Sequence, residues 1–149
     1  MEEIKRILIA TDGSEPTKPA VEQGLHLAKL LGAKVTALFV VDQIPLQNVP
    51  ADSTVVFSVH ALLESEGKKA VSDVKDAGER IGVEVTPLVV EGSPARKIVE
   101  LAADFDLIVM GTLGRSGLSK LLLGSVAERV ARFAPCPVLI VRAKRKAGQ

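Results

Sequence analysis

The chain has 149 residues, which is long enough for one domain with a full hydrophobic core. Its 47% hydrophobic and 25% charged residues match the average of globular proteins and exclude a disordered chain. A net charge of +1 at pH 7 excludes a general attraction to nucleic acid or membranes. We expect a domain over residues 1–142 and a basic, flexible tail over residues 143–149.

Cysteine content and hydropathy indicate the compartment. The single cysteine, Cys136, excludes an intramolecular disulfide and suits a reducing environment. It lies in "APCPV", directly before an apolar run, which favours a packed thiol over a nucleophile. The chain opens without a basic-then-apolar leader, and no apolar run approaches the roughly 18 residues of a membrane span. We therefore expect a cytoplasmic protein.

Five apolar runs rich in β-branched residues predict strands. Because the runs are nearly continuous rather than alternating, they indicate strands covered on both faces. The predicted strands span residues 6–11, 34–42, 83–92, 106–112 and 137–142. Helical periodicity fills the intervals, as in Val21, Leu25, Ala28 and Leu31. The alternation predicts a single-domain α/β fold, an open five-stranded parallel sheet with helices on both faces.

Turn and cap residues support the same boundaries. Gly32 and Gly82 each end a helical pattern before a strand. Ser14 and Ser93 follow strands and are predicted helix N-caps. The one long connection, residues 43–58, is expected to cover a ligand, to meet a partner or to be disordered.

Two strand ends carry unusual residues. The first strand ends in Thr11-Asp12-Gly13-Ser14, and the fourth runs into a glycine-rich loop. In an open parallel sheet, ligands bind beyond the carboxyl ends of the strands, where the strand order reverses. If both ends serve one ligand, the first and fourth strands are neighbours. The alternative for Asp12 is a turn or cap residue that needs no ligand.

The glycine spacing in the loop suits a nucleotide. Gly111 is followed by two residues and Gly114, then by nine residues and Gly124-Ser125. A glycine at a strand end lets a sugar approach, and the helix N-terminus at Ser125 suits a phosphate. Arg115 and Lys120 add positive charge. The alternative is a capping box over Ser125-Val126-Ala127-Glu128, which needs no ligand.

On these residues the chain resembles the universal stress protein family, in particular its ATP-binding branch with the signature G-x2-G-x9-G-[ST]. The match is complete at Gly111, Gly114, Gly124 and Ser125. The segments "ILIATDGS", "LFVVD" and "APCPVLIV" extend the resemblance over about residues 3–142. The sequence departs from the pattern at Leu113, where many members carry a histidine, so any contact of that side chain is lost.

The resemblance implies the strand order 3-2-1-4-5 and ATP as the ligand. A Mg²⁺ ion that accompanies ATP would rely mainly on phosphates and water, and Asp12 could help to place it, but a single carboxylate is a weak metal site by itself. It puts Asp12 beside the adenosine, the backbone of Val40 at the adenine and Gly111 against the ribose. The loop glycines, Ser125 and the amides that follow it would hold the phosphates. The full set of nucleotide-binding residues that it implies is Ala10, Thr11, Asp12, Val40, Met110, Gly111, Leu113, Gly114, Arg115, Gly124, Ser125, Val126 and Ala127.

Three functions stay open on the sequence. The first is an ATP-binding regulatory module of the stress response. The second is an enzyme, a slow ATPase or a self-phosphorylating protein with Ser116, Ser119 or Ser125 as acceptor. The third is a scaffold that binds no nucleotide because of Leu113. No P-loop and no G-x-G-x-x-G motif is present, and His26 and His60 lie outside any catalytic motif.

The implied strand order leaves the last strand, Val138–Val141, at an edge of the sheet. An apolar edge with unpaired backbone groups invites a second chain, so we expect a homodimer through this strand. The alternative is that the tail or the long connection covers the edge.

Overall fold

Five parallel strands form the centre of the molecule. The computed structural model describes residues 3–43, 54–112 and 123–143. The strands are β1 (Arg6–Ala10), β2 (Lys34–Asp42), β3 (Val85–Gly92), β4 (Leu107–Gly111) and β5 (Val138–Val141). They pair in the order β3-β2-β1-β4-β5, which confirms the predicted α/β fold and strand order. The observed strands begin and end at most two residues inside the predicted runs.

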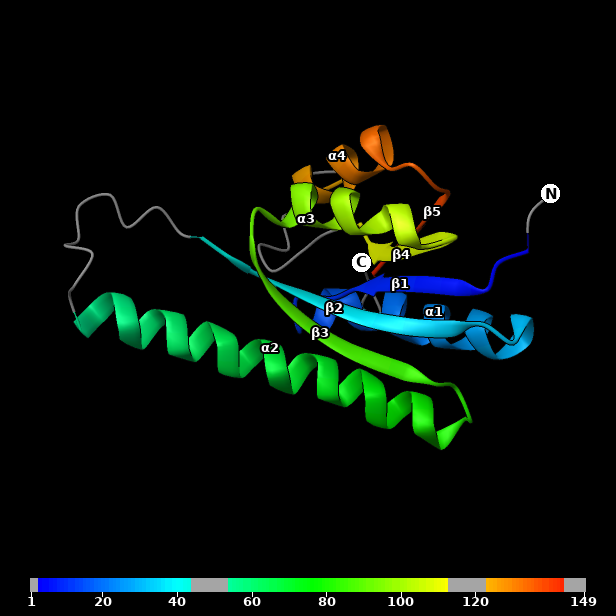
Figure 1. The fold of residues 1–149 in the computed structure, drawn as a ribbon, viewed down its shortest axis with the longest axis horizontal. Coiled ribbons are helices and arrows are strands. Elements are labelled where there is room, and N and C mark those ends of the chain that lie inside the picture. Colours follow the sequence, from blue (N-terminus) through cyan, green and yellow to red (C-terminus); the bar gives the residue numbers. More distant parts are fainter. Residues whose placement is uncertain (1–2, 44–53, 113–122, 144–149) are drawn as a thin grey trace, which may run out of the picture.

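The strand order reverses between β1 and β4. The chain builds outwards from β1 through β2 to β3 and then returns to place β4 on the other side of β1 (Figure 1). Ile9 pairs with Val109 of β4, and Ala10 pairs with Leu38 of β2. The carboxyl ends of β1 and β4 therefore lie side by side, as the sequence predicts for strands that serve one ligand.

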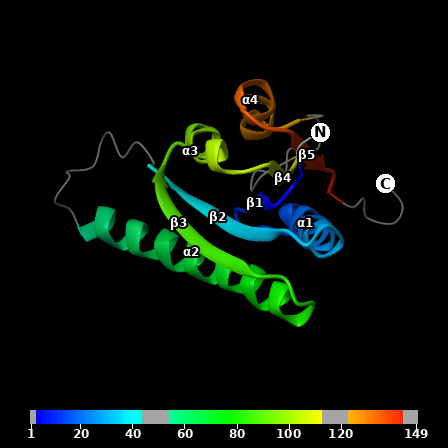
Figure 2. The same cartoon turned by 45° about the vertical axis from the view of Figure 1, so that its right-hand side comes forward.

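Helices cover both faces of the sheet. The helices α1 (Lys18–Leu31) and α2 (Thr54–Arg80) pack on one face, and α3 (Pro94–Leu101) and α4 (Ser125–Phe133) pack on the other (Figure 2). Short 3-10 helices precede α1 and follow α3, η1 (Glu15–Thr17) and η2 (Ala102–Asp104). None of the helices in the described part of the chain has the length and hydrophobicity needed to cross a bilayer.

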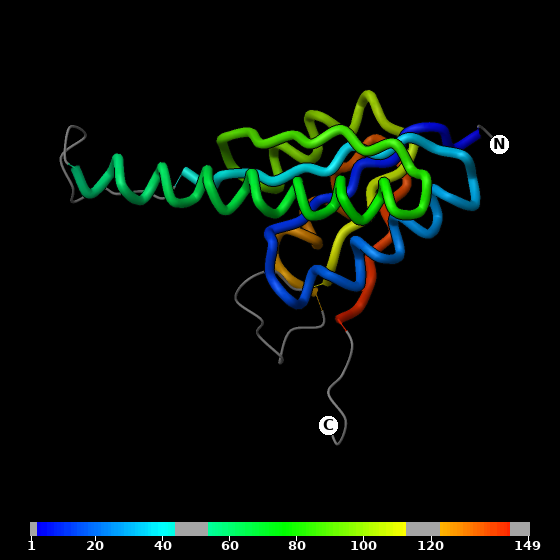
Figure 3. The backbone as a smooth tube through the Cα atoms, turned by 90° about the horizontal axis from the view of Figure 1, so that it is seen from below, coloured from blue at the N-terminus to red at the C-terminus, as the bar shows by residue number. Residues whose placement is uncertain are grey.

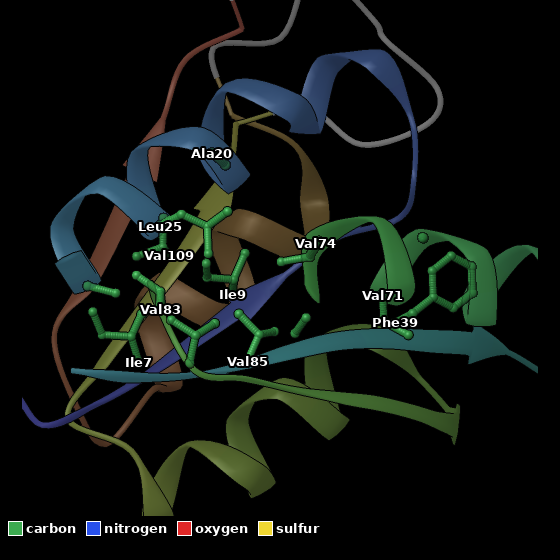
Figure 4. Close-up of a cluster of buried hydrophobic side chains, with 14 of the residues drawn as sticks. Ile7, Ile9, Ala20, Leu25, Phe39, Val71, Val74, Val83, Val85 and Val109 are labelled. Atoms are coloured by element: carbon green, nitrogen blue, oxygen red, sulfur yellow. The ribbon is translucent and has the colours of Figure 1, made fainter. Parts of the chain in front are cut away.

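The core consists of two layers, one on each face of the sheet. Successive β1 side chains alternate between them, with Ile7 and Ile9 on the α1/α2 face and Leu8 on the α3/α4 face. All three side chains are fully buried. Figure 4 shows the first layer, in which Leu25 of α1 and Val74 of α2 meet Ile9. Because helices bury both faces of the sheet, the strand sequences are nearly continuous apolar runs.

The N-terminal boundary of α2 differs from the prediction. We expected the long connection to reach Ser58, but α2 begins at Thr54, so residues 54–58 are helical. Val56 and Val59 are half-buried in these turns and continue the inward face of the helix. The β-branched residues of these turns are therefore helical despite their low intrinsic helix propensity. Residues 44–53 of the predicted connection lie outside the described residues.

The predicted helix ends and N-cap positions are confirmed, and the two N-cap serines make no side-chain cap bond. Gly32 and Gly82 take the left-handed conformation, with φ of 65° and 79°, at the ends of α1 and α2. Ser14 and Ser93 occupy N-cap positions, but neither side chain bonds the helix that it precedes. The Ser14 hydroxyl donates to Asp12 instead.

A carboxylate ties the beginnings of β1 and β4 together. Asp106, directly before β4, accepts hydrogen bonds at 2.9 Å from the backbone N–H groups of Lys5 and Arg6. These two donors hold the pKa of Asp106 below its ordinary value. A carboxyl whose pKa is lowered by folding stabilises the protein above its unfolded-state pKa. That contribution is lost as the pH falls through the folded-state pKa.

We predict that Asp106→Asn lowers the free energy of unfolding at neutral pH, because the charge-assisted bonds to Lys5 and Arg6 weaken. The difference from wild type should shrink as the pH falls below 3.8, the ordinary pKa of this carboxyl. Urea unfolding from about pH 7 down to pH 3 checks the prediction. Asp104→Asn, which removes the same charge from an exposed residue of η2, is the control. A difference that stays constant with pH would contradict it.

Candidate functional site

A cavity opens where the strand order reverses. It has a volume of about 410 Å³ and lies at the carboxyl ends of β1, β2 and β4, beside the start of α4. The sequence-predicted site residues that line it are Ala10, Thr11, Asp12, Val40, Met110, Gly111, Gly124, Ser125, Val126 and Ala127. The other predicted residues, Leu113, Gly114 and Arg115, lie outside the described residues, as does Lys120. Every predicted site residue that the structure describes therefore lines one cavity.

Several lining residues escaped the sequence analysis. They are Thr17, Leu38, Phe39, Val41, Asp42, Leu63, Pro94, Ile98 and Thr112. The segment "LFVVD" points to those of β2, since its residues surround the predicted Val40. Leu63 comes from α2, and its apolar helical position in the sequence carries no signal that separates it from an ordinary core residue.

The end of β1 is shaped by Asp12. Its Oδ1 accepts hydrogen bonds from the Ser14 N–H at 2.9 Å, the Ser14 hydroxyl at 2.5 Å and the Thr17 hydroxyl at 3.3 Å. Gly13 has φ of +75°, and a Cβ there would lie 3.2 Å from Ala70 of α2. A side chain at Gly13 would therefore strain the turn and crowd α2. Asp12 builds this turn while it also lines the cavity, so its structural and ligand-binding interpretations are compatible.

The backbone of β2 faces the cavity beyond the end of β1. The Leu38 carbonyl accepts the Thr11 N–H at 2.9 Å, and the Lys34 N–H donates to the Lys5 carbonyl at 2.9 Å. Even-numbered residues of β2 therefore direct their peptide groups towards β1, since alternate residues of a parallel strand bond the same neighbour. The pairing ends at Ala10 and Leu38. Val40 thus directs its N–H and C=O to the side where β1 has ended and the cavity begins.

The helix α4 begins one residue earlier than the capping-box interpretation requires. Gly124 is the N-cap residue, and Ser125 is the first helical residue with no side-chain cap bond. The Gly124 N–H donates to the Thr112 carbonyl at 2.6 Å, and the Glu128 N–H donates to the Gly124 carbonyl at 2.9 Å. A capping box with Ser125 as N-cap is therefore wrong, because the bond to Thr112 holds Gly124 at that position. The N-terminus of α4 adjoins the cavity through Ser125 and Val126.

The charged side chains in the described lining of the cavity are all negative. Its described lining includes the carboxylates of Asp12 and Asp42 but no lysine or arginine. The N-terminus of α4 carries a partial positive charge, which favours an anion at this part of the cavity wall. Across residues 3–43, 54–112 and 123–143, no three His, Cys, Asp or Glu side chains gather as metal ligands.

Cys136 lies away from the cavity lining and belongs to the α3/α4 core layer. Burial, with a smaller contribution from the charge of Asp106, raises the pKa of its thiol. A raised pKa disfavours the thiolate, which agrees with a packed thiol rather than a nucleophile.

Sequence comparison now identifies the family. A sequence model of the universal stress protein family matches residues 3–142. The chain belongs to the universal stress protein family. The universal stress protein MJ0531 of Methanocaldococcus jannaschii is 44% identical over 144 residues, which cover 95% of this chain and 84% of the relative. The family resemblance stated on the sequence is thus confirmed.

Solved structures agree with this assignment. The structure of MJ0577, a universal stress protein of Methanocaldococcus jannaschii, superposes with a TM-score of 0.82 at 31% identity and covers 97% of this chain and 100% of that one. A universal stress protein in complex with cAMP superposes with a TM-score of 0.71 at 25% identity. That match covers 96% of this chain and 100% of the other.

Proposed function

We propose that this protein binds ATP in the cavity at the strand-order reversal and acts as a nucleotide-binding regulatory module of the cytoplasm. The observation that carries the proposal is the placement of two complementary surfaces on one cavity. The strand end at Val40 offers backbone groups suited to a base, and the start of α4 offers a helix N-terminus suited to phosphates.

The base end of the cavity suits adenine. Val40 directs one donor and one acceptor into the space that β1 leaves, and the edge of adenine carries the amino group N6 beside the acceptor N1. Apolar side chains, Ile98 and Met110 among them, line the same space and favour a flat ring over water. The complex of another universal stress protein with cAMP supports an adenine nucleotide as the ligand class.

The phosphate end relies on α4. Backbone N–H groups in the first turn of a helix lack intrahelical partners, and they carry the positive end of the helix dipole. Ser125, Val126 and Ala127 are these residues of α4, and all three line the cavity. Mg²⁺ would enter with ATP, held mainly by phosphates and water, with Asp12 supplying a carboxylate.

We predict that Mg-ATP raises the melting temperature of the purified protein. At a hundredfold excess over the dissociation constant, binding stabilises the fold by about 2.7 kcal/mol, or roughly 5–10 °C for a domain of this size. Because the chain has no Trp and no Tyr, nucleotide retained through purification would dominate its ultraviolet spectrum. Labelled ATP tests turnover in the same preparation. If ATP neither co-purifies nor shifts the melting temperature at millimolar concentration, the scaffold alternative holds.

We predict that Gly124→Val weakens ATP binding at least tenfold, or about 1.4 kcal/mol, because a branched side chain occupies the approach of the phosphates. The fold should persist, since Gly124 has φ of −69° and ψ of 161°, which valine adopts readily. Isothermal titration measures the affinity, and the melting temperature reports folding. Ala131→Val, on the exposed part of the same helix, is the control. Unchanged affinity in folded Gly124→Val would mean that the phosphates bind elsewhere.

The same proposal includes a homodimer through β5. In the described sheet β5 is an edge strand, and its four apolar residues are half-buried. The Ile108 N–H donates to the Pro137 carbonyl, and the Thr112 N–H donates to the Val141 carbonyl. Odd-numbered residues of β5 therefore bond β4, and Val138 and Ile140 direct their peptide groups outwards.

We predict that Ile140→Pro converts a dimer into a folded monomer. Proline removes an outward donor but leaves the bonds between β4 and β5 intact, and edge strands tolerate it. Sedimentation of the native protein and the variant at equal concentration measures the change. A native protein that is monomeric at high micromolar concentration would rule out this dimer.

A further inference from the structure

The helix α2 contributes to the candidate nucleotide cavity from the α1/α2 face of the sheet, opposite to α4. Its first turns project beyond the sheet (Figure 3), and Leu63 is its contribution to the described lining. Phe39, which packs in the core layer beneath α2, lines the cavity as well. The wall near Val40 of β2 therefore depends on where α2 lies.

Three residues on one face of α2 make contacts that set this position. His60, Leu63 and Gly67 have the i, i+3, i+7 spacing that aligns side chains along a helix. His60 Nδ1 lies 3.2 Å from Glu91 Oε1 at the end of β3. Gly67 packs against the Phe39 ring so closely that a Cβ there would lie 2.7 Å from a ring carbon. Leu63 lies between these two contacts.

The rest of this part of α2 contributes little packing. From Thr54 to Leu63 the helix has no Asp, Glu, Lys or Arg, yet three of its large apolar side chains face solvent. Val55 is 56% exposed, Phe57 is 69% exposed and Leu62 is 59% exposed. A helical segment with few buried contacts unfolds locally at low cost. The position of this helical segment against the cavity therefore depends strongly on the contacts of its inward-facing side chains.

We propose that His60 and Glu91 are positioning residues that hold the first turns of α2 so that Leu63 closes the base end of the nucleotide cavity. The inference rests on the proposed ATP binding and extends it to a helix that the glycine signature does not include. It makes α2 part of base recognition, since Leu63 and Phe39 flank the strand end that faces the adenine. A bound nucleotide in turn stabilises the first turns of α2, because the coupling between ligand and helix is reciprocal.

The matched pair Leu63→Ala and Leu62→Ala tests the contact with the base. The two residues are neighbours on α2, but Leu63 lines the cavity and Leu62 faces solvent. We expect Leu63→Ala to weaken ATP about tenfold, or about 1.4 kcal/mol, in isothermal titration. Its selectivity for ATP over inorganic tripolyphosphate should fall by the same factor, because tripolyphosphate lacks the base. Leu62→Ala should change neither quantity.

The pair His60→Ala and His60→Gln tests the positioning contact. Alanine removes the side chain that contacts Glu91, whereas glutamine keeps a polar N–H group at this position, so His60→Ala should lose ATP affinity severalfold and His60→Gln should recover it. Hydrogen–deuterium exchange adds a readout on the helix itself. ATP should slow amide exchange over residues 54–63 in the wild type and in His60→Gln, but much less in His60→Ala.

The outcomes separate the two proposals. A wild-type protein that does not bind ATP overturns both. If the wild type binds ATP, an unchanged affinity in Leu63→Ala overturns the inference alone. An equal loss of ATP and tripolyphosphate binding in Leu63→Ala also overturns it, because a general loss of structure then explains the result. Exchange over residues 54–63 that ATP does not slow in the wild type overturns the positioning role.

Discussion

The structure depends on one geometric constraint, the pairing of β1 with both β2 and β4. Because β2 and β4 lie on opposite sides of β1, the connections that follow β1 and β4 leave the sheet towards opposite faces. The strand β1 also ends at Ala10, while β2 continues to Asp42. The peptide groups of Val40, which point towards β1, consequently face a space instead of a neighbouring strand. The cavity is the direct result of unequal strand lengths at the reversal point.

Two sets of hydrogen bonds hold the segments that border this space. The turn after β1 is held by Asp12, whose Oδ1 receives three hydrogen bonds from Ser14 and Thr17. On the other side, the bond from Gly124 to the Thr112 carbonyl fixes the start of α4 against the end of β4. The groups that form the walls are thus positioned by the fold itself.

The helix α2 connects the cavity with a surface that the family signature does not describe. Gly67 allows close approach to Phe39, and His60 contacts Glu91 of β3 one turn before Leu63. The exposed Phe57 and Leu62 lie on the same turns. Any change in the position of Leu63 therefore also moves an apolar surface, which connects the part of the cavity near Val40 with the outside of the protein.

The sequence by itself determined the strands, the α/β class and much of the candidate site, because local patterns encode them. Apolar runs mark strands buried on both faces, and Gly32 and Gly82 end helices through the left-handed conformation that glycine adopts without strain. The glycine spacing from Gly111 to Ser125 and the residues Thr11-Asp12 indicated lining residues that the structure brings to one cavity. Only the tertiary structure decided the start of α2 at Thr54, the N-cap role of Gly124 and the part played by Leu63. Each of these depends on a contact between residues distant in the sequence or separated by a loop, such as Gly124 with Thr112 and His60 with Glu91. Periodicity and propensity describe a residue's local neighbours, so they carry no information on which distant group completes its environment.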